Sequence, residues 1–281
     1  GTRLTSAAGA PTLVVAGEDD IFTPLAFSKE IAAGIPGAEL LTFADAGHAV
    51  LGGAHRGEIA LYANINRATI DRSPAGFAAT AERALKHGFS MFKLAPFDEL
   101  SPEACEGDDF AARLDAGLAR VAATRAVIGP EAQLRVDCHW RFTEPAAQTL
   151  IEAAVPLGLD WIECPIAETP ANAAAIAGLR RTANAEGIRL AGLEMGVGLE
   201  AFAPYLEAGA YDVIMPDVKY LGGLALMMDL AALAARHGAV LSLHNPTGPV
   251  CHAASLHVSA ALPAYDSLEM QFDESPLFDA L

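Results

Sequence analysis

The 281-residue sequence predicts an α/β fold, a TIM-type (β/α)7β barrel that is preceded by a short separate α/β segment. From residue 51 onwards, short apolar runs of strand length alternate with longer amphipathic stretches of helical length. Nearly every apolar run also ends in an ionisable residue, which is typical of the rim that the carboxyl ends of barrel strands form. We therefore divide the chain into residues 1–49 and a catalytic barrel of residues 50–281.

The composition excludes several classes of function. The formal net charge of −17 argues against nucleic acid as a partner, because phosphate binding needs a basic surface. No apolar run reaches membrane-spanning length, and no basic-then-apolar leader opens the sequence. The four cysteines are scattered and form no Cys-x-x-Cys pair, as in a reduced protein of the cytoplasm. We expect a cytoplasmic homo-oligomer that acts on a small molecule and binds no membrane.

The first part of the chain has its own strand and helix pattern. Apolar runs predict strands over 11–17 and 38–43, with a helix over about 25–33 between them. The motif Gly-x-x-Asp-x-x-Thr-Pro and a later Gly-His pair resemble the C-terminal portion of α/β-hydrolases. The resemblance matches Asp20 to the triad acid and His48 to the triad base. Because the sequence contains no Gly-x-Ser-x-Gly nucleophile elbow, we expect a fragment without acyl-transfer activity.

The second part is expected to hold eight strands and seven helices in regular alternation. The first of these helices begins with Ser73 as its cap and Pro74 at its first position. The expected strands are 61–67, 90–97, 133–140, 159–165, 188–194, 211–217, 239–246 and 266–272. The expected helices are 74–87, 108–127, 144–155, 171–186, 199–208, 223–237 and 250–262. Function is then expected at the carboxyl ends of the strands.

Three successive strands of the expected barrel end in an acid: Asp137, Glu163 and Glu194. Between them lies about one strand–helix–strand unit, so successive parallel strands would bring the three carboxylates side by side at one rim. Three hard oxygen ligands, with room for water and substrate, suit Mg²⁺. Taken alone, the same pattern also fits three unrelated acids at strand ends, where loops begin and charge is common.

Ionisable side chains also end other strands of the barrel. They are Lys93 on the second strand, Asp217 on the sixth, His244 on the seventh and Glu269 on the eighth. His139 lies two residues after Asp137, so strand alternation places both on the inward face.

These strand ends resemble the enolase superfamily in its mandelate racemase-like branch. The motifs VDCH, IECP, LAGLE, MPDVKYLGG, LHNPTGP and LEMQF occur in the family's order. The resemblance implies Mg²⁺ on the three acids, a His244 base paired with Asp217, and Glu269 as the acid of the eighth strand. Family members commonly carry Lys-x-Lys on the second strand. The sequence FKLA keeps Lys93 and has Ala95 at the second position, which disfavours two-base racemisation.

The implied chemistry is removal of the proton α to a carboxylate that is bound to a divalent cation. His244, oriented by Asp217, is the expected base. Glu269 would donate a hydrogen bond to the developing oxyanion if burial kept it protonated. Lys93 would polarise the carboxylate from the opposite side, and His139 is expected to contact the substrate.

Three functions stay open at this point. Dehydration of a sugar acid to a 2-keto-3-deoxy acid, a carbon–oxygen lyase reaction, is favoured because one His–Asp base and one lysine suit elimination of a β-hydroxyl. A racemase or epimerase of a 2-hydroxy or amino acid would need Lys93 as its second base. A non-catalytic barrel that binds metal is the third. The resemblance implies an N-terminal capping domain that chooses the substrate, and in this sequence the hydrolase-like segment stands in its place.

Overall fold

The computed structural model describes residues 13–17, 25–34, 39–43 and 56–275, and these residues fall into two compact units. In the first unit, strand β1 (Leu13–Gly17) pairs in parallel with β2 (Glu39–Phe43), and helix α1 (Leu25–Gly34) lies between them in the sequence. These elements match the expected order of strand, helix and strand. Asp20 and His48 lie outside the described residues.

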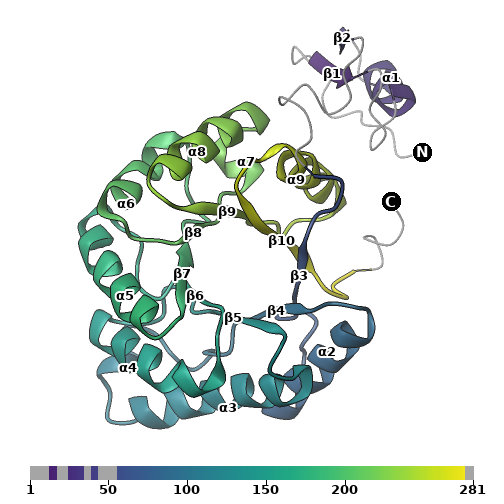
Figure 1. Ribbon diagram of the computed structural model, residues 1–281. Coiled ribbons are helices and arrows are strands. Elements are labelled where there is room, and N and C mark those ends of the chain that lie inside the picture. The colour runs from purple at the N-terminus through teal and green to yellow at the C-terminus, as the bar shows by residue number, and fades with distance from the viewer. Residues whose placement is uncertain (1–12, 18–24, 35–38, 44–55, 276–281) are drawn as a thin grey trace. The chain divides into compact units, whose positions relative to one another are not determined.

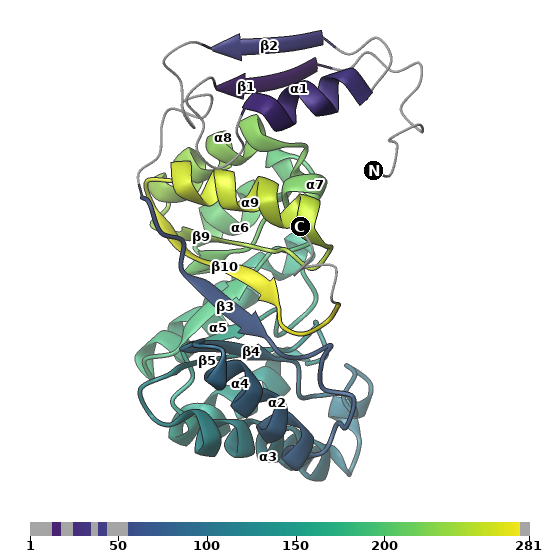
Figure 2. The ribbon, with the colours of Figure 1, turned by 90° about the vertical axis from the view of Figure 1, so that its right-hand side faces the viewer.

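The second unit is a closed barrel of eight parallel strands, which Figure 1 shows as a ring of strands with helices around it. The strands are β3 (Leu61–Asn64), β4 (Met91–Leu94), β5 (Gln133–Asp137), β6 (Trp161–Glu163), β7 (Arg189–Gly192), β8 (Val213–Ile214), β9 (Val240–Leu243) and β10 (Tyr265–Gln271). Each strand pairs with its neighbours in the sequence, and β10 pairs with β3 to close the ring (Figure 2). The predicted TIM-type barrel is confirmed.

Helices follow the strands as the alternation predicts. They are α2 (Pro74–Lys86), α3 (Phe110–Ile128), α4 (Glu144–Ala154), α5 (Ala173–Ala185), α6 (Ala203–Ala208), α7 (Val218–Leu221), α8 (Leu224–Arg236) and α9 (Pro249–Ala261). Ser73 caps α2, since its hydroxyl accepts the backbone N–H of Gly76 at 3.2 Å. Helix α7 is a single turn that the sequence pattern did not predict. Among the described residues, we find no helix long and apolar enough to cross a membrane.

The strands hold two different environments inside the ring. An apolar cluster fills part of the interior: Tyr62, Trp161, Ala191, Val213 and Met215. Beside it lies Arg135 of β5, whose guanidinium carbon is 3.7 Å from the centre of the Trp161 ring. Arg135 is fully buried and pairs with Asp160 at 2.9 Å and with Asp266 at 3.0 Å. Asp160 precedes β6 and Asp266 lies at the start of β10, so this charge-balanced network occupies the amino ends of the strands. The candidate site lies at the opposite, carboxyl ends of the strands.

Candidate active site

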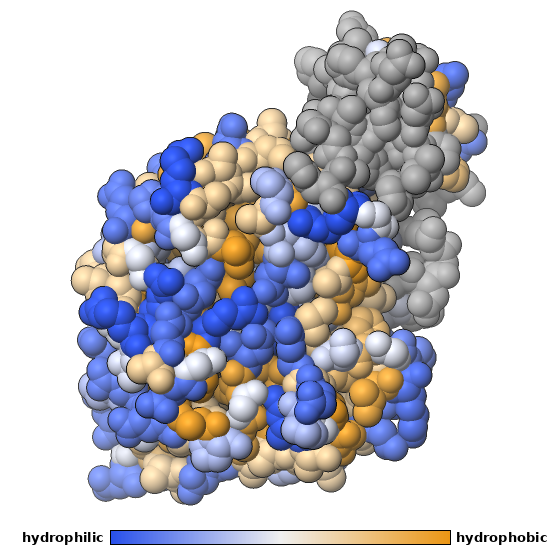
Figure 3. Space-filling view, in the orientation of Figure 1, coloured by the Kyte–Doolittle hydropathy of each residue, from blue (hydrophilic) through white to orange (hydrophobic). Residues whose placement is uncertain are grey.

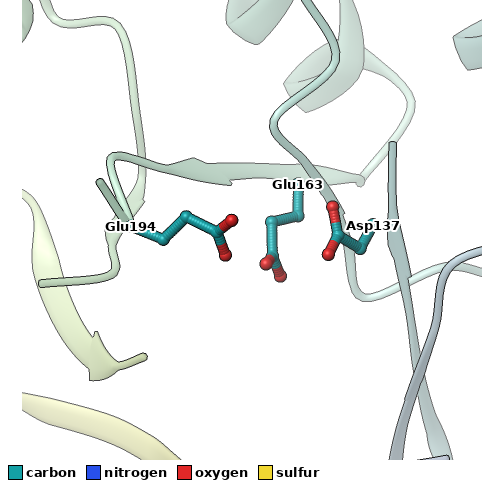
Figure 4. Close-up of side chains that lie close together, drawn as sticks. All are labelled: Asp137, Glu163 and Glu194. Atoms are coloured by element: carbon teal, nitrogen blue, oxygen red, sulfur yellow. The ribbon is translucent and has the colours of Figure 1, made fainter. Parts of the chain in front are cut away.

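The three predicted metal ligands come together at the carboxyl ends of β5, β6 and β7. One oxygen from each of Asp137, Glu163 and Glu194 lies within 4.8 Å of the others, and all three side chains are buried. Figure 4 shows the three carboxyl groups in a row, with Glu163 in the middle. The strand register explains the arrangement in part, because Asp137 on β5 is directly opposite Glu163 on β6.

The backbone takes an unusual conformation beside each of these acids. The four non-glycine residues concerned have positive φ angles: His139 (46°), Trp140 (57°), Cys164 (45°) and Leu193 (71°). L-residues rarely adopt this left-handed region, which costs about 1–3 kcal/mol per residue. Such residues persist only where the surrounding structure holds them, and they gather at functional sites. Here they turn the chain sharply within three residues of each proposed ligand.

The charges of the three acids are poorly balanced. Burial, together with repulsion from the neighbouring acids, raises the pKa of Glu163 to about 8 and that of Glu194 to about 10. Asp137 differs, because His139 bonds to it at 2.8 Å and outweighs the effect of burial, so its pKa is lowered. A cluster of buried carboxylates with raised pKa values favours a bound cation, and oxygen ligands of this kind suit a hard divalent ion. The residues present therefore fit a metal such as Mg²⁺.

Lys93 and Glu269 lie beside the cluster and are paired with each other. The Lys93 ammonium is 2.7 Å from Glu163 and 3.0 Å from Glu269, and all three side chains are almost fully buried. Burial alone would raise the pKa of Glu269, but Lys93, His244 and the backbone N–H of Asn245 lower it to about 2. Glu269 is therefore a carboxylate that accepts hydrogen bonds. Protonation of Glu269, which its expected role as a donor to an oxyanion requires, is opposed here because the lysine beside it stabilises the charged form.

Two residues that the sequence did not single out, Asn64 and Asn245, hold the Glu269 carboxylate in place. The Asn64 amide donates to one carboxylate oxygen at 2.7 Å, and the Asn245 backbone N–H donates to the other at 2.8 Å. Both residues stand at strand ends, Asn64 closing β3 and Asn245 following His244. They were missed because only ionisable strand-end residues were considered as candidates.

His244 lies between Asp217 and the acid cluster of Asp137, Glu163 and Glu194. Its Nδ1 is 3.0 Å from Asp217 Oδ2, and its Nε2 is 3.4 Å from Glu194 Oε2. Asp217 is fully buried and caps α7, and its Oδ2 also accepts a hydrogen bond from the Lys219 ammonium at 2.7 Å. Strand β8 ends at Ile214 and Asp217 begins the helical turn α7, so Lys219 lies back against the acid.

The site residues line a cavity of about 320 Å³. Six of the eight predicted site residues contribute to its wall: Lys93, Asp137, His139, Glu194, His244 and Glu269. The other two lie behind them, Glu163 bonded to Lys93 and Asp217 bonded to His244. The other lining residues are mostly polar: Asn64, Asn66, Arg67, Met195, Tyr220, Pro246, Thr247 and Gln271. Figure 3 shows hydrophilic residues gathered over the centre of the barrel on the face in view, with hydrophobic patches between them. A polar cavity of this size suits a small hydroxylated acid.

Comparisons with known proteins find matches for both parts of the chain. Residues 76–281 match the family profile described as enolase C-terminal domain-like, and residues 2–58 match an α/β-hydrolase profile described as TAP-like protein. A D-galactonate dehydratase from Ralstonia nicotianae is 31% identical over 209 residues, which cover 74% of this chain and 51% of that protein. A D-gluconate dehydratase from Thermoproteus tenax is 29% identical over 231 residues, which cover 81% of this chain and 44% of that protein. The chain thus spans about half the length of these relatives.

Solved structures give the same result for the fold. A mandelate racemase/muconate lactonizing enzyme-like protein from Roseovarius sp. TM1035 superposes with a TM-score of 0.71 at 26% identity, covering 83% of this chain and 59% of that one. A member of the enolase superfamily from Salmonella Typhimurium superposes with a TM-score of 0.71 at 23% identity, covering 80% and 59%. The chain belongs to the enolase C-terminal domain-like family, as the motifs at its strand ends predicted.

Proposed function

We propose that the barrel catalyses Mg²⁺-dependent dehydration of a sugar acid to a 2-keto-3-deoxy acid. The observation that carries the proposal is the position of His244, whose Nδ1 is fixed on Asp217 while its Nε2 faces Glu194 of the acid cluster. A base in this place would reach a substrate whose carboxylate is bound to a cation held by the three acids. The printed names of the relatives, D-galactonate and D-gluconate dehydratase, support the same substrate class.

The residues divide the reaction between them. A divalent cation held by Asp137, Glu163 and Glu194 would stabilise the negative charge that develops on the substrate carboxylate. His244 Nε2 accepts the proton from the α-carbon, and Asp217 holds the imidazole in the required tautomer and orientation. The protonated His244 then delivers its proton to the β-hydroxyl, which leaves as water as the Cβ–O bond breaks. The enol that remains tautomerises to the 2-keto acid.

The state of Lys93 argues against the second candidate, a racemase or epimerase. Racemisation needs a base on each face of the α-carbon, and Ala95 stands where a second lysine would be. Burial alone would lower the pKa of Lys93, but Glu163 and Glu269 raise it well above its ordinary value. A lysine that stays protonated donates hydrogen bonds and does not accept a proton. We infer that Lys93 orients the substrate carboxylate, and that His139, on the cavity wall, contacts the substrate.

The test is turnover of a sugar-acid library in deuterated water with Mg²⁺. Dehydration gives a 2-keto-3-deoxy acid, whereas racemisation gives deuterium at the α-carbon without net loss of water. A barrel that binds Mg²⁺ but changes none of the acids would support the non-catalytic alternative and overturn the proposal. The expected homo-oligomer and cytoplasmic location remain predictions, which gel filtration with light scattering and cell fractionation would test.

A further inference from the structure

Glu168 is a half-buried acid that does not line the cavity of the acid cluster. It has no part in the proposed reaction. It stands five residues after Glu163, in the segment between β6 and α5. Its Oε1 accepts the backbone N–H of Leu193 at 2.6 Å and the hydroxyl of Tyr211 at 2.7 Å. The Cys164 thiol is 3.7 Å from the same oxygen, and the Trp140 side chain lies near the carboxylate on the wall of the same cavity.

The contacts of Glu168 reach the chain next to all three proposed ligands. Trp140 follows Asp137 by three residues, Cys164 directly follows Glu163, and Leu193 directly precedes Glu194. These three contacted residues all have positive φ angles, between 45° and 71°. One carboxylate therefore bonds to the turns at Cys164 and Leu193 and lies near the turn at Trp140. Strained turns persist only where other contacts hold them, and Glu168 supplies such a contact at two of these turns.

The end of β7 packs tightly against this carboxylate, with no room for a side chain at Gly192. A Cβ added at Gly192 would lie 2.4 Å from Glu168 Oε1 and 2.6 Å from Tyr211 Cζ. Such distances are shorter than any van der Waals contact, so only glycine allows the strand to approach this closely. The end of β7, two residues before Glu194, packs directly against Glu168.

Glu168 does not line the cavity that holds the acid cluster. It lines a second cavity of about 480 Å³, whose lining contains none of the three proposed ligands and neither His244 nor Lys93. Its Oε1 already accepts two hydrogen bonds, from Leu193 and Tyr211. Any effect of Glu168 on the reaction must then pass through the residues that it holds.

We propose that Glu168 is a positioning residue that fixes the strand ends of Asp137, Glu163 and Glu194 in the geometry required to bind the cation. The inference rests on the proposed metal site. Groups that orient metal ligands without touching the metal commonly contribute about 10- to 100-fold to metal affinity. The same loss is expected here when Glu168 is removed, since three ligands relax at once.

The experiment is a calorimetric titration of Mg²⁺ into the wild-type protein and four variants at one pH. Glu168→Ala should raise the Mg²⁺ Kd by about 10- to 100-fold. Glu168→Gln keeps one acceptor oxygen and should raise Kd less, and Tyr211→Phe, which removes one donor, should have the smallest effect. The matched control is Asp212→Asn. Asp212 accepts the backbone N–H of Leu190 at 2.8 Å. Leu190 lies on β7, three residues before the strained turn at Leu193 that Glu168 contacts.

The outcomes separate the inference from the proposed function. Asp212→Asn should lower the melting temperature of the metal-free protein and leave Kd unchanged, because its role is structural only. If Glu168→Gln and Tyr211→Phe are folded and bind Mg²⁺ as tightly as the wild type, Glu168 is not a positioning residue, even where Glu168→Ala fails to fold. If the wild-type protein binds no Mg²⁺ at all, the metal site itself is wrong and the proposed function fails with it.

Discussion

Binding of Mg²⁺ to the acid cluster should be strongly coupled to pH. The carboxylates must lose their protons before they bind a cation, so metal and protons compete for the same oxygens. The pKa of Glu163 is raised to about 8 and that of Glu194 to about 10, so both carry a proton at neutral pH in the metal-free protein. Affinity should therefore rise with pH through this range and fall as the medium becomes more acidic.

The magnitude follows from these values. One pKa unit corresponds to about 1.4 kcal/mol, so removing the protons at pH 7 costs about 1.4 kcal/mol for Glu163 and about 4 kcal/mol for Glu194. Below pH 8 two protons are displaced, and the Kd for Mg²⁺ should fall by about 100-fold per pH unit. Between pH 8 and pH 10 one proton remains, and the dependence should weaken to about 10-fold per unit.

The assay is titration calorimetry in two buffers that differ in ionisation enthalpy, which counts the protons released per Mg²⁺ bound. Glu194→Gln removes one of the competing protons, so its dependence below pH 8 should drop to about 10-fold per unit. Glu186→Gln changes an exposed acid at the end of α5 and should behave as the wild type. A Kd that is independent of pH, without proton release, would refute the argument that three acids are held this close in the absence of metal.

Three substitutions test other parts of the barrel. His244→Asn should slow α-proton exchange by at least about 100-fold and leave Mg²⁺ binding in place, measured by NMR in deuterated water. Arg135→Met removes one of the two cations that pair with Asp160 and Asp266, which leaves both acids to Arg189, and should lower the free energy of unfolding by about 3–5 kcal/mol in denaturant titrations. Gly192→Ala pushes a methyl group into Glu168 and should lower the free energy of unfolding by about 1–3 kcal/mol.

Each of these substitutions has a control of the same chemical type. His237→Asn and Arg236→Met alter exposed residues at the end of α8 and should change neither exchange nor stability appreciably. Gly178→Ala lies within α5, where the nearest atom is a flexible arginine nitrogen at 3.7 Å, and should stabilise the protein by about 1 kcal/mol. Equal effects of test and control substitutions would contradict the roles assigned here.

The sequence was sufficient to predict the barrel and the residues at its rim because both depend on local pattern. Apolar runs of fixed length define the strands, and the first polar residue after each run marks the carboxyl end. Parallel pairing in a closed barrel then brings these ends to one face, so Asp137, Glu163 and Glu194 could be placed together without knowledge of any contact. The structure adds that β5 and β6 are in direct register at the first two of them.

The contacts behind the rim could not be predicted, because they join loops through turns that leave the strand pattern. Lys219 illustrates this, since β8 ends at Ile214 and Asp217 begins a helical turn that the alternation rule does not describe. Glu168 is a second case. Nothing in its local sequence indicates that a strained turn at Leu193 will bring a backbone N–H to its carboxylate. The ionisation of Glu269 likewise depends on Lys93, which is distant in sequence.

The two ends of the barrel carry different charge balances, and the difference accounts for how the site is maintained. At the amino ends, Arg135 and Arg189 face Asp160 and Asp266, so two cations meet two acids. Buried pairs of this kind need no further ion, and the aromatic ring of Trp161 packs against Arg135.

At the carboxyl ends, the balance is incomplete. Asp137, Glu163, Glu194 and Glu269 gather around Lys93, and the chain beside the first three takes strained backbone conformations. The burial of these acids and the backbone strain beside them oppose folding, so they must be offset by packing elsewhere in the same ring of strands. The closed barrel provides this, because each strand runs from the balanced end to the unbalanced one. A bound divalent cation would replace the protons on Glu163 and Glu194 and neutralise the carboxylates that those protons leave behind.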